Sequence, residues 1–153
     1  MSERNRCIPA VYLLLRRGDE VLLQRRQNTG YYDGWYEVTA GHVEHGELPT
    51  DAVLREAREE IGIELERSNV RCAHVMYRTK SDETGDRLDY FFEAKKWSGE
   101  PTILEAAVCD DLAWFSLHAL PENVIHHIRY AIESVERGEA YSENAQENLL
   151  QRN

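Results

Sequence analysis

Three glutamates that share one face of a helix are the residues best suited to chemistry in this sequence. The segment from Thr50 to Ile61 lacks Gly and Pro and is rich in strong helix formers, which predicts a helix that ends at Gly62. Because each helical residue turns by about 100°, Glu56, Glu59 and Glu60 lie within an arc of about 100°. Oxygen ligands of this kind suit Mg²⁺, Mn²⁺ or Ca²⁺, and a solvated acidic face is the alternative interpretation.

The sequence around this helix matches a known motif. Gly41 is followed after five residues by Glu47 and, after seven more, by Arg-Glu-Ala-Arg-Glu-Glu-Ile-Gly-Ile at residues 55–63. All seven fixed positions and both apolar positions of the Nudix box are present, so the chain resembles the Nudix hydrolases. The resemblance extends to the glycine- and aromatic-rich loop at residues 28–35 and to residues 112–121, and it covers roughly residues 7–137.

The resemblance implies both a fold and a reaction. The fold is of the α/β (α+β) class, a Nudix-type α/β/α sandwich with a mixed β-sheet between helices. The reaction is cleavage of a diphosphate linkage in a nucleoside diphosphate derivative or a nucleoside triphosphate, by metal-activated attack of water at phosphorus. Carried over by position, the ligands of Mg²⁺ or Mn²⁺ are Glu56, Glu59, Glu60 and the backbone carbonyl of Gly41, and Arg55 and Glu47 brace the loop and the helix.

The general base of this reaction is left open by the sequence. Within the box, Glu56 and Glu59 are equally placed to accept the proton of the attacking water. Some Nudix hydrolases instead carry the base, or an extra metal ligand, on a loop outside the box. Glu105 is the best-placed residue for that role, followed by Glu100 and the loop at residues 82–86. A lone glutamate in a loop is more often simply solvated.

Aromatic and basic residues before the box are candidates for substrate binding. Tyr32 and Trp35 could stack on a base or pack against neighbouring strands, and Arg25 could contact a substrate phosphate or remain in solvent. Thr79 stands where the ADP-ribose and dinucleoside-polyphosphate members of the family carry Pro or Tyr. The base and the leaving group of the substrate therefore stay open.

The elements that position these residues follow from the hydrophobic pattern. Apolar, β-rich segments predict strands at residues 7–16, 21–25, 36–40, 70–79, 88–96 and 112–116. Apolar residues at helical spacing predict a second helix over residues 122–137. Strands interspersed with two helices indicate a single layered domain, residues 1–138, and the polar stretch at residues 139–153 predicts a C-terminal tail.

The charge and composition of the chain limit the kinds of partner that it can bind. The 153 residues include 18 Lys and Arg against 28 Asp and Glu, a net charge of −10, which disfavours nucleic-acid polymers and anionic membranes but not small nucleotides. No apolar run approaches the roughly 20 residues that span a bilayer, and no signal peptide is recognisable. The three cysteines, Cys7, Cys72 and Cys109, form no disulfide framework, which predicts a cytoplasmic protein. The sequence allows a homodimer without specifying one.

A second function of a different class stays open. A Nudix-fold module can bind a nucleotide or regulate a partner without hydrolysing anything. Such catalytically silent members usually lack one or more glutamates of the box, and none is missing here. The sequence therefore favours the hydrolase over the binding module.

Overall fold

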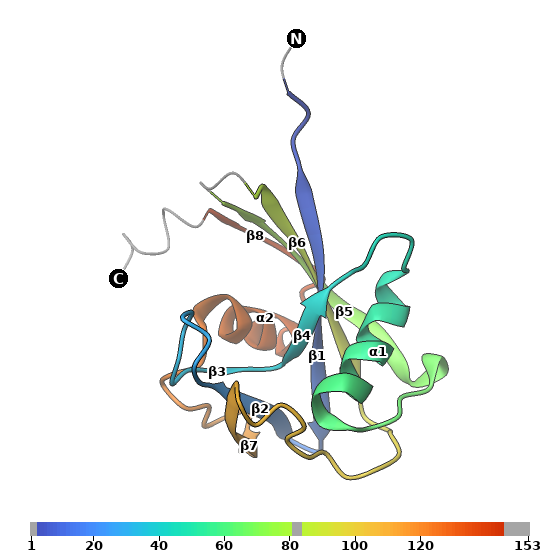
Figure 1. The fold of residues 1–153 in the computed structure, drawn as a ribbon, viewed down its shortest axis with the longest axis vertical. Coiled ribbons are helices and arrows are strands. Elements are labelled where there is room, and N and C mark those ends of the chain that lie inside the picture. Colours follow the sequence, from blue (N-terminus) through green and yellow to red (C-terminus); the bar gives the residue numbers. More distant parts are fainter. Residues whose placement is uncertain (1–2, 81–83, 146–153) are drawn as a thin grey trace.

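The computed structural model describes residues 3–80 and 84–145 (Figure 1). Its elements are β1 (Cys7–Arg17), β2 (Glu20–Arg26), β3 (Tyr36–Glu37), β4 (Thr39–His42), α1 (Pro49–Ile61), the 3₁₀ turn Arg67–Asn69, β5 (Val70–Thr79), β6 (Asp86–Ala94), β7 (Cys109–Ser116), α2 (His126–Glu136) and β8 (Tyr141–Ala145). In this part of the chain, neither α1 nor α2 has the length and apolar character that crossing a membrane requires.

The strands form one mixed sheet with β1 near its centre. The order is β3-β2-β1-β6-β5-β8, with β4 paired to β1 and β7 paired to β2. β1 runs parallel to β6 and antiparallel to β4, so the strand that carries Gly41 is linked through β1 to β6. The predicted strand at residues 36–40 is two short strands, because residues 36–37 pair with β2 whereas residues 39–42 pair with β1.

Alternate residues of β1 enter two separate hydrophobic clusters. Side chains of successive strand residues point to opposite faces of a sheet, so β1 serves both faces. The set on the α1 side is Val11, Leu13 and Leu15, and the set on the α2 side is Ala10, Tyr12 and Leu14. Figure 1 shows α1 and α2 on opposite sides of β1. The predicted sandwich, with a mixed sheet between helices, is thereby confirmed.

The ends of α1 follow from local chemistry. Pro49 is the first helical residue, a position where its missing N–H costs no hydrogen bond. Gly62 ends the helix as predicted, with a left-handed φ of 69°, and its N–H points to the carbonyls of Ala57 and Arg58. α1 therefore presents the glutamates of the box on a helix with defined ends.

α2 begins four residues later than predicted, at His126. The N–H of Tyr36 donates to the Asn123 carbonyl at 2.7 Å, and the N–H of Ile125 donates to the Tyr36 carbonyl at 3.0 Å. These bonds pair residues 123–125 with β3. The apolar periodicity predicted this helix correctly. Its start is later because backbone groups of residues 123–125 form hydrogen bonds with β3 instead of helical ones.

The segment after Gly138 differs from the predicted polar tail, because residues 141–145 form β8 alongside β5. The buried His74 holds the connection, with ring nitrogens 2.7 Å from the Glu139 carbonyl oxygen and 2.7 Å from Ser142 Oγ. Ser142 and Asn144 are the inward-facing residues of β8. The buried positions of this strand are therefore polar, and the usual pattern of buried apolar residues is missing. Residues 146–153 of the predicted tail lie outside the described residues, and the boundary at residue 138 stays a prediction.

Candidate active site

The carboxylate face, Glu56, Glu59 and Glu60 of α1, lies against β4. The contact is tightest between Glu56 and Gly41, where a Cβ built on the glycine would lie 2.1 Å from Glu56 Oε1. No side chain larger than hydrogen fits there without moving the Glu56 carboxylate. The fixed glycine of the box is therefore explained by close packing against the Glu56 carboxylate.

Arg55 links the loop before α1 to the carboxylate face. Its Nε and Nη2 donate to the two carboxylate oxygens of Glu47, at 2.9 and 3.0 Å. Its Nη1 donates to Glu56 at 2.7 Å and to Glu59 at 3.2 Å, and its Nη2 also reaches the His42 carbonyl. The hydrogen bonds from Arg55 lower the pKa of Glu47. This is the geometry that a brace between loop and helix requires.

The Arg55–Glu47 pair gives a testable stability effect. Glu47→Gln removes the charge of a carboxylate that is 16% exposed and bound by two donors of Arg55. We expect a loss of about 1–2 kcal/mol in the free energy of unfolding, measured by urea denaturation. Glu44→Gln is the matched control, because Glu44 is 68% exposed and 3.8 Å from Arg55, and we expect less than about 0.5 kcal/mol. Equal losses in the two variants would contradict the brace.

Glu60 is the most deeply placed carboxylate of this face. Its Oε2 accepts hydrogen bonds from the Ala40 N–H at 3.2 Å and from Gln24 Nε2 at 3.3 Å. Burial, with smaller effects from the charges of Glu56 and Glu37, raises the pKa of Glu60 to about 9. Burial also raises the pKa of Glu56. The ionised forms of Glu56 and Glu60 are therefore incompletely stabilised by the charges and hydrogen bonds around them.

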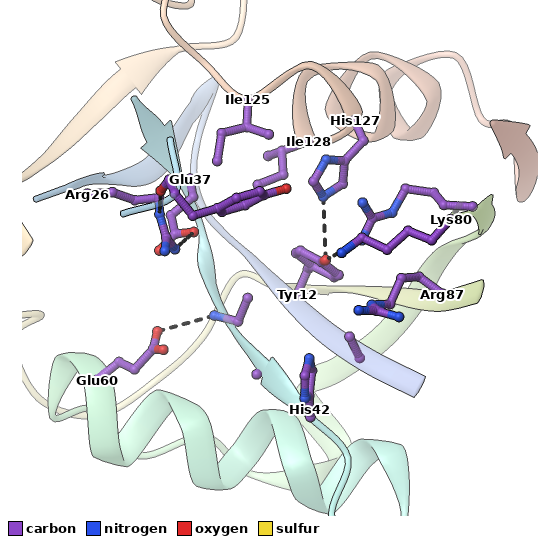
Figure 2. A pocket seen from close by; sticks show the side chains of 15 residues that line it. Tyr12, Arg26, Glu37, His42, Glu60, Lys80, Arg87, Ile125, His127 and Ile128 are labelled. Carbon is purple, nitrogen blue, oxygen red and sulfur yellow. Dashed lines mark hydrogen bonds and ion pairs between the residues drawn. The ribbon is translucent and has the colours of Figure 1, made fainter. Parts of the chain in front are cut away.

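A cavity of about 340 Å³ adjoins this face and extends toward α2 (Figure 2). Gly41, His42 and Glu60 line it on the side of α1. Across the cavity lie Tyr12 of β1, Arg78 of β5, Arg87 of β6 and His127 of α2, together with Lys80. The cavity therefore joins an acidic side to a basic side.

A buried network supports the basic side. Arg78 donates through Nε and Nη2 to the carboxylate of Asp89, which is fully buried, and its Nη2 also donates to Tyr12 Oη at 3.2 Å. Tyr12 Oη lies 3.4 Å from His127 Nε2. Burial, followed by the nearby charge of Arg78, lowers the pKa of His127. Hydrogen bonds therefore link Asp89, Arg78, Tyr12 and His127 along the wall of the cavity near α2. His127 is neutral at pH 7.

Comparison with known proteins decides the family. The family model described as NUDIX domain matches residues 7–135. The chain belongs to the Nudix hydrolase family. The resemblance inferred from Gly41–Ile63 is thereby confirmed.

Relatives of this Nudix chain include longer proteins. The NAD-capped RNA hydrolase NudC of Pseudomonas aeruginosa is 38% identical over 117 residues, which cover 76% of this chain and 38% of NudC. NudC of Pseudomonas fluorescens is 33% identical over 116 residues, again 76% of this chain and 39% of that protein. The chain thus spans less than two fifths of the length of these curated relatives.

Solved Nudix structures share the fold. A MutT NUDIX hydrolase from Burkholderia pseudomallei aligns with a TM-score of 0.75 and 28% identity, covering 84% of this chain and 97% of that chain. A MutT protein from Methanosarcina mazei Go1 aligns with a TM-score of 0.71 and 22% identity over 89% of this chain and 97% of that chain, which supports the fold alone.

Nudix hydrolases generally need divalent metal ions, and the donor set of this chain suits them. Within residues 3–80 and 84–145, no three His, Cys, Asp or Glu side chains are arranged as a ready-made metal site. Arg55 donates to one carboxylate oxygen of Glu56 and to one of Glu59. Three carboxylates and the Gly41 carbonyl are the oxygen donors that a hard divalent ion prefers. Glu56 and Glu59 would each offer the ion their other carboxylate oxygen, Oε2 and Oε1, so Arg55 could keep its hydrogen bonds.

Glu105, proposed from the Nudix resemblance, lies in a loop that packs on the end of α1. Thr102 donates its N–H to the Ile61 carbonyl at 3.0 Å, and Leu104 donates to the Glu60 carbonyl at 3.4 Å. Glu105 is exposed, and its charge contributes to the raised pKa of Glu56. Its loop thus brings Glu105 to the carboxylate face. Residues 82 and 83 of the other candidate loop lie outside the described residues.

The three residues predicted to bind substrate do not line the cavity described above. Arg25 forms an ion pair with Asp110 at 2.8 Å, and Tyr32 and Trp35 pack edge to face against each other. Their neighbours Arg26 and Tyr31 line the cavity instead. Arg26 shares the face of Gln24, since both side chains donate to Glu37, and the alternation of β2 turns Arg25 to the other face. Substrate contact by Arg25, Tyr32 and Trp35 stays a prediction.

Sequence reasoning missed Arg78, Arg87 and His127. Arg78 was an ordinary charged residue of a predicted strand, Arg87 ended a predicted charged loop, and His127 was a polar residue of a predicted helix. The parallel pairing of β1 with β6 and the placement of α2 bring them together, and neither has a local sequence signal. The available hint was the presence of Arg87 and Asp89 at alternating, inward-facing positions of one strand.

Proposed function

We propose that this chain is a Mg²⁺- or Mn²⁺-dependent hydrolase that cleaves a diphosphate linkage in a small nucleotide derivative. The observation that carries the proposal is the half-buried Glu60, grouped with Glu56 and Glu59 beside a cavity whose opposite side is basic. A nucleotide needs both halves of this arrangement. A metal on the acidic half would hold the diphosphate, and the cavity has a volume within the usual range of ligand sites, roughly 300–1,000 Å³.

The residues divide the catalytic work as follows. Glu56, Glu59, Glu60 and the Gly41 carbonyl would hold the divalent ion, which when bound neutralises phosphate charge and lowers the pKa of the attacking water. Glu56 or Glu59 would accept the proton of that water. Glu59 is 55% exposed and Glu56 is 12% exposed, so Glu59 has the easier access to solvent and Glu56 the more fixed position. Arg55 and Glu47 would hold the loop and α1 in register.

Partners and compartment follow from the same properties. The net charge of −10 favours small nucleotides over nucleic-acid polymers, although the NudC relatives are named for NAD-capped RNA. Cys7, Cys72 and Cys109 are free thiols, which supports a reducing, cytoplasmic location. A homodimer stays untested.

A substrate panel tests this function. Nucleoside triphosphates, nucleotide sugars, ADP-ribose, dinucleotides and capped RNA would be incubated with Mg²⁺ or Mn²⁺, and kcat/KM compared. We expect one class of diphosphate to be cleaved, and Glu59→Gln to lower its turnover at least about 100-fold, because a metal ligand or base is lost.

The control is Glu64→Gln, which neutralises a carboxylate 66% exposed just beyond α1 and should keep full activity. Full turnover by a folded Glu59→Gln variant would show that the assigned site is wrong. Tight nucleotide binding without any product after long incubation with Mn²⁺ would instead identify the binding module.

A further inference from the structure

Arg87 is a buried cation that donates its hydrogen bonds to neutral acceptors. Its residue is 9% exposed, and its guanidinium donates to the Gly85 carbonyl at 2.6 Å and to Thr84 Oγ1 at 2.9 Å. Across residues 3–80 and 84–145, no carboxylate lies within ion-pair distance of it. Arg87 acts on the carboxylates of Asp86 and Asp89 only through space, where its charge favours their ionised forms. A buried guanidinium whose direct hydrogen bonds go to neutral acceptors is a favourable place for an anion to bind.

The two carboxylates near Arg87 are engaged elsewhere. Asp89 accepts from Arg78, and Asp86 accepts from Tyr77 Oη at 2.7 Å and from the Lys80 N–H at 3.1 Å. These bonds hold both acids in place on the strand. The guanidinium of Arg87 points to the side of the cavity lined by Tyr12 and His42 (Figure 2). A ligand in the cavity can therefore reach it.

Arg87 lies two strands away from the carboxylate face, where the scissile diphosphate would bind. Gly41 is on β4, which pairs with β1, and β1 pairs with β6, which carries Arg87. β6 pairs in turn with β5, where Arg78 lies opposite Arg87. With strands about 4.8 Å apart, β6 lies about 10 Å and β5 about 14 Å from β4. Gly41 is level with Val11 and so with Tyr90 of β6, and Arg87 lies three residues further along that strand, about 10 Å. The Arg87 side chain covers only part of the combined separation, and a nucleoside is long enough to cover the rest.

We propose that Arg78, Lys80 and Arg87, the distal basic cluster, form a second phosphate subsite, and that the substrate is a nucleoside diphosphate derivative whose nucleoside carries a further phosphate. The inference rests on the proposed function for the position of the diphosphate. In this arrangement the diphosphate lies at the carboxylate face, the nucleoside crosses the cavity past Tyr12, and the additional phosphate accepts hydrogen bonds from Arg87. Arg78, fixed by Asp89, adds positive charge without moving.

Binding of product-like nucleotides tests the subsite without requiring turnover. Calorimetry in Mg²⁺ would compare adenosine 5′-monophosphate with adenosine 2′,5′-bisphosphate and adenosine 3′,5′-bisphosphate, which differ from it by one phosphate. We expect one bisphosphate to bind at least about tenfold more tightly, because charge-assisted hydrogen bonds to a buried arginine form with that phosphate alone.

Variants assign the effect to Arg87. Arg87→Gln should reduce the preference to less than about twofold, and thermal melting would report that the variant is folded. Arg87→Lys, which keeps the charge, should retain part of the preference. Arg71→Gln is the matched control, because it removes a 68% exposed arginine at the other end of β5 and should keep the whole preference.

The source of the phosphate is distinguished by further ligands. A preference for the 2′,5′-bisphosphate would be followed by comparing hydrolysis of NADPH with NADH, and a preference for the 3′,5′-bisphosphate by comparing coenzyme A with dephospho-coenzyme A. The dinucleotide pApA, whose 3′-phosphate is a diester, separates a free nucleotide from an RNA end. Each preference supports the subsite only if Arg87→Gln abolishes it.

Two results would overturn the inference. One is equal affinity of wild type for the monophosphate and both bisphosphates, and the other is a preference that survives in a folded Arg87→Gln variant. These failures differ from failure of the proposed function. A preference for a bisphosphate without hydrolysis of any substrate would support the subsite and contradict the proposed hydrolase. Hydrolysis without such a preference would support the hydrolase and contradict the subsite.

Discussion

Replacing Glu60 by Gln is expected to make the metal-free chain more stable while lowering its turnover at least about 100-fold. Burial and the neighbouring Glu56 and Glu37 raise the pKa of Glu60 to about 9. At pH 7 the carboxyl is therefore protonated in the folded chain and ionised in the unfolded chain. Gln keeps an oxygen for the Ala40 N–H without this cost, and we expect a gain of about 2–3 kcal/mol in the free energy of unfolding.

The sign of the pH dependence checks the same assignment. The folded pKa of Glu60 lies above its ordinary value of 4.5, so the stability of the metal-free wild type should fall as pH rises from about 4.5 to about 9. Urea denaturation in EDTA at pH 5.5, 7 and 8.5 would measure this slope, which Glu60→Gln should flatten. Glu66→Gln, at an exposed position after α1, should keep it. A Glu60→Gln variant less stable than wild type at pH 8.5 would refute the buried-carboxyl assignment.

Adding one methyl group at Gly41 is expected to lower kcat about 100-fold. In the Gly41→Ala variant the added Cβ would lie within 2.1 Å of Glu56 Oε1, so the Glu56 carboxylate must move out of its position on the carboxylate face. Displacement of a catalytic group by about 1 Å has effects of this size. The φ of Gly41 is not in the left-handed region, so backbone strain adds nothing. Steady-state kinetics with Mg²⁺, together with thermal melting, would measure the two effects separately.

Gly46→Ala is the informative counterpart of Gly41→Ala. Gly46 has a left-handed φ of 80° and no atom within 4 Å of an added Cβ, so its substitution strains the backbone without touching a carboxylate. We expect it to cost about 1 kcal/mol of stability with kcat within about threefold of wild type. If Gly41→Ala also lowered stability but left kcat unchanged, the close packing on Glu56 would have no catalytic meaning.

The sandwich was predictable from the sequence wherever packing leaves a periodic pattern. β1 alternates between two clusters, and the carboxylate helix ends at a glycine, so both were recognised. β8 was not, because Ser142 and Asn144 are its buried residues and no apolar alternation marks it. The late start of α2 depends on hydrogen bonds between residues 123–125 and Tyr36, which are distant in sequence.

The candidate site divides in the same way. The box residues lie within 23 positions of the chain, so their spacing alone brings Gly41, Arg55 and the three glutamates together. The opposite side of the cavity is assembled by strand pairing between β1, β6 and β5. Arg78 and Arg87 could be grouped only once that pairing was known. The choice of Arg26 over Arg25 likewise depends on which face of β2 meets the cavity, and the sequence alone does not give that face.

The position of β8 bears on where this domain can be cut. A fragment ending at residue 138, after α2, would lose the strand that pairs with Val75–Thr79 of β5, and this half of β5 would then form an open edge with unpaired backbone N–H and carbonyl groups. Such edges recruit strands from other molecules. The His74 side chain of β5, which is buried in the intact domain, would also lose its partners at Glu139 and Ser142. Recombinant fragments should therefore extend at least through Ala145, because shorter ones are prone to self-association and precipitation.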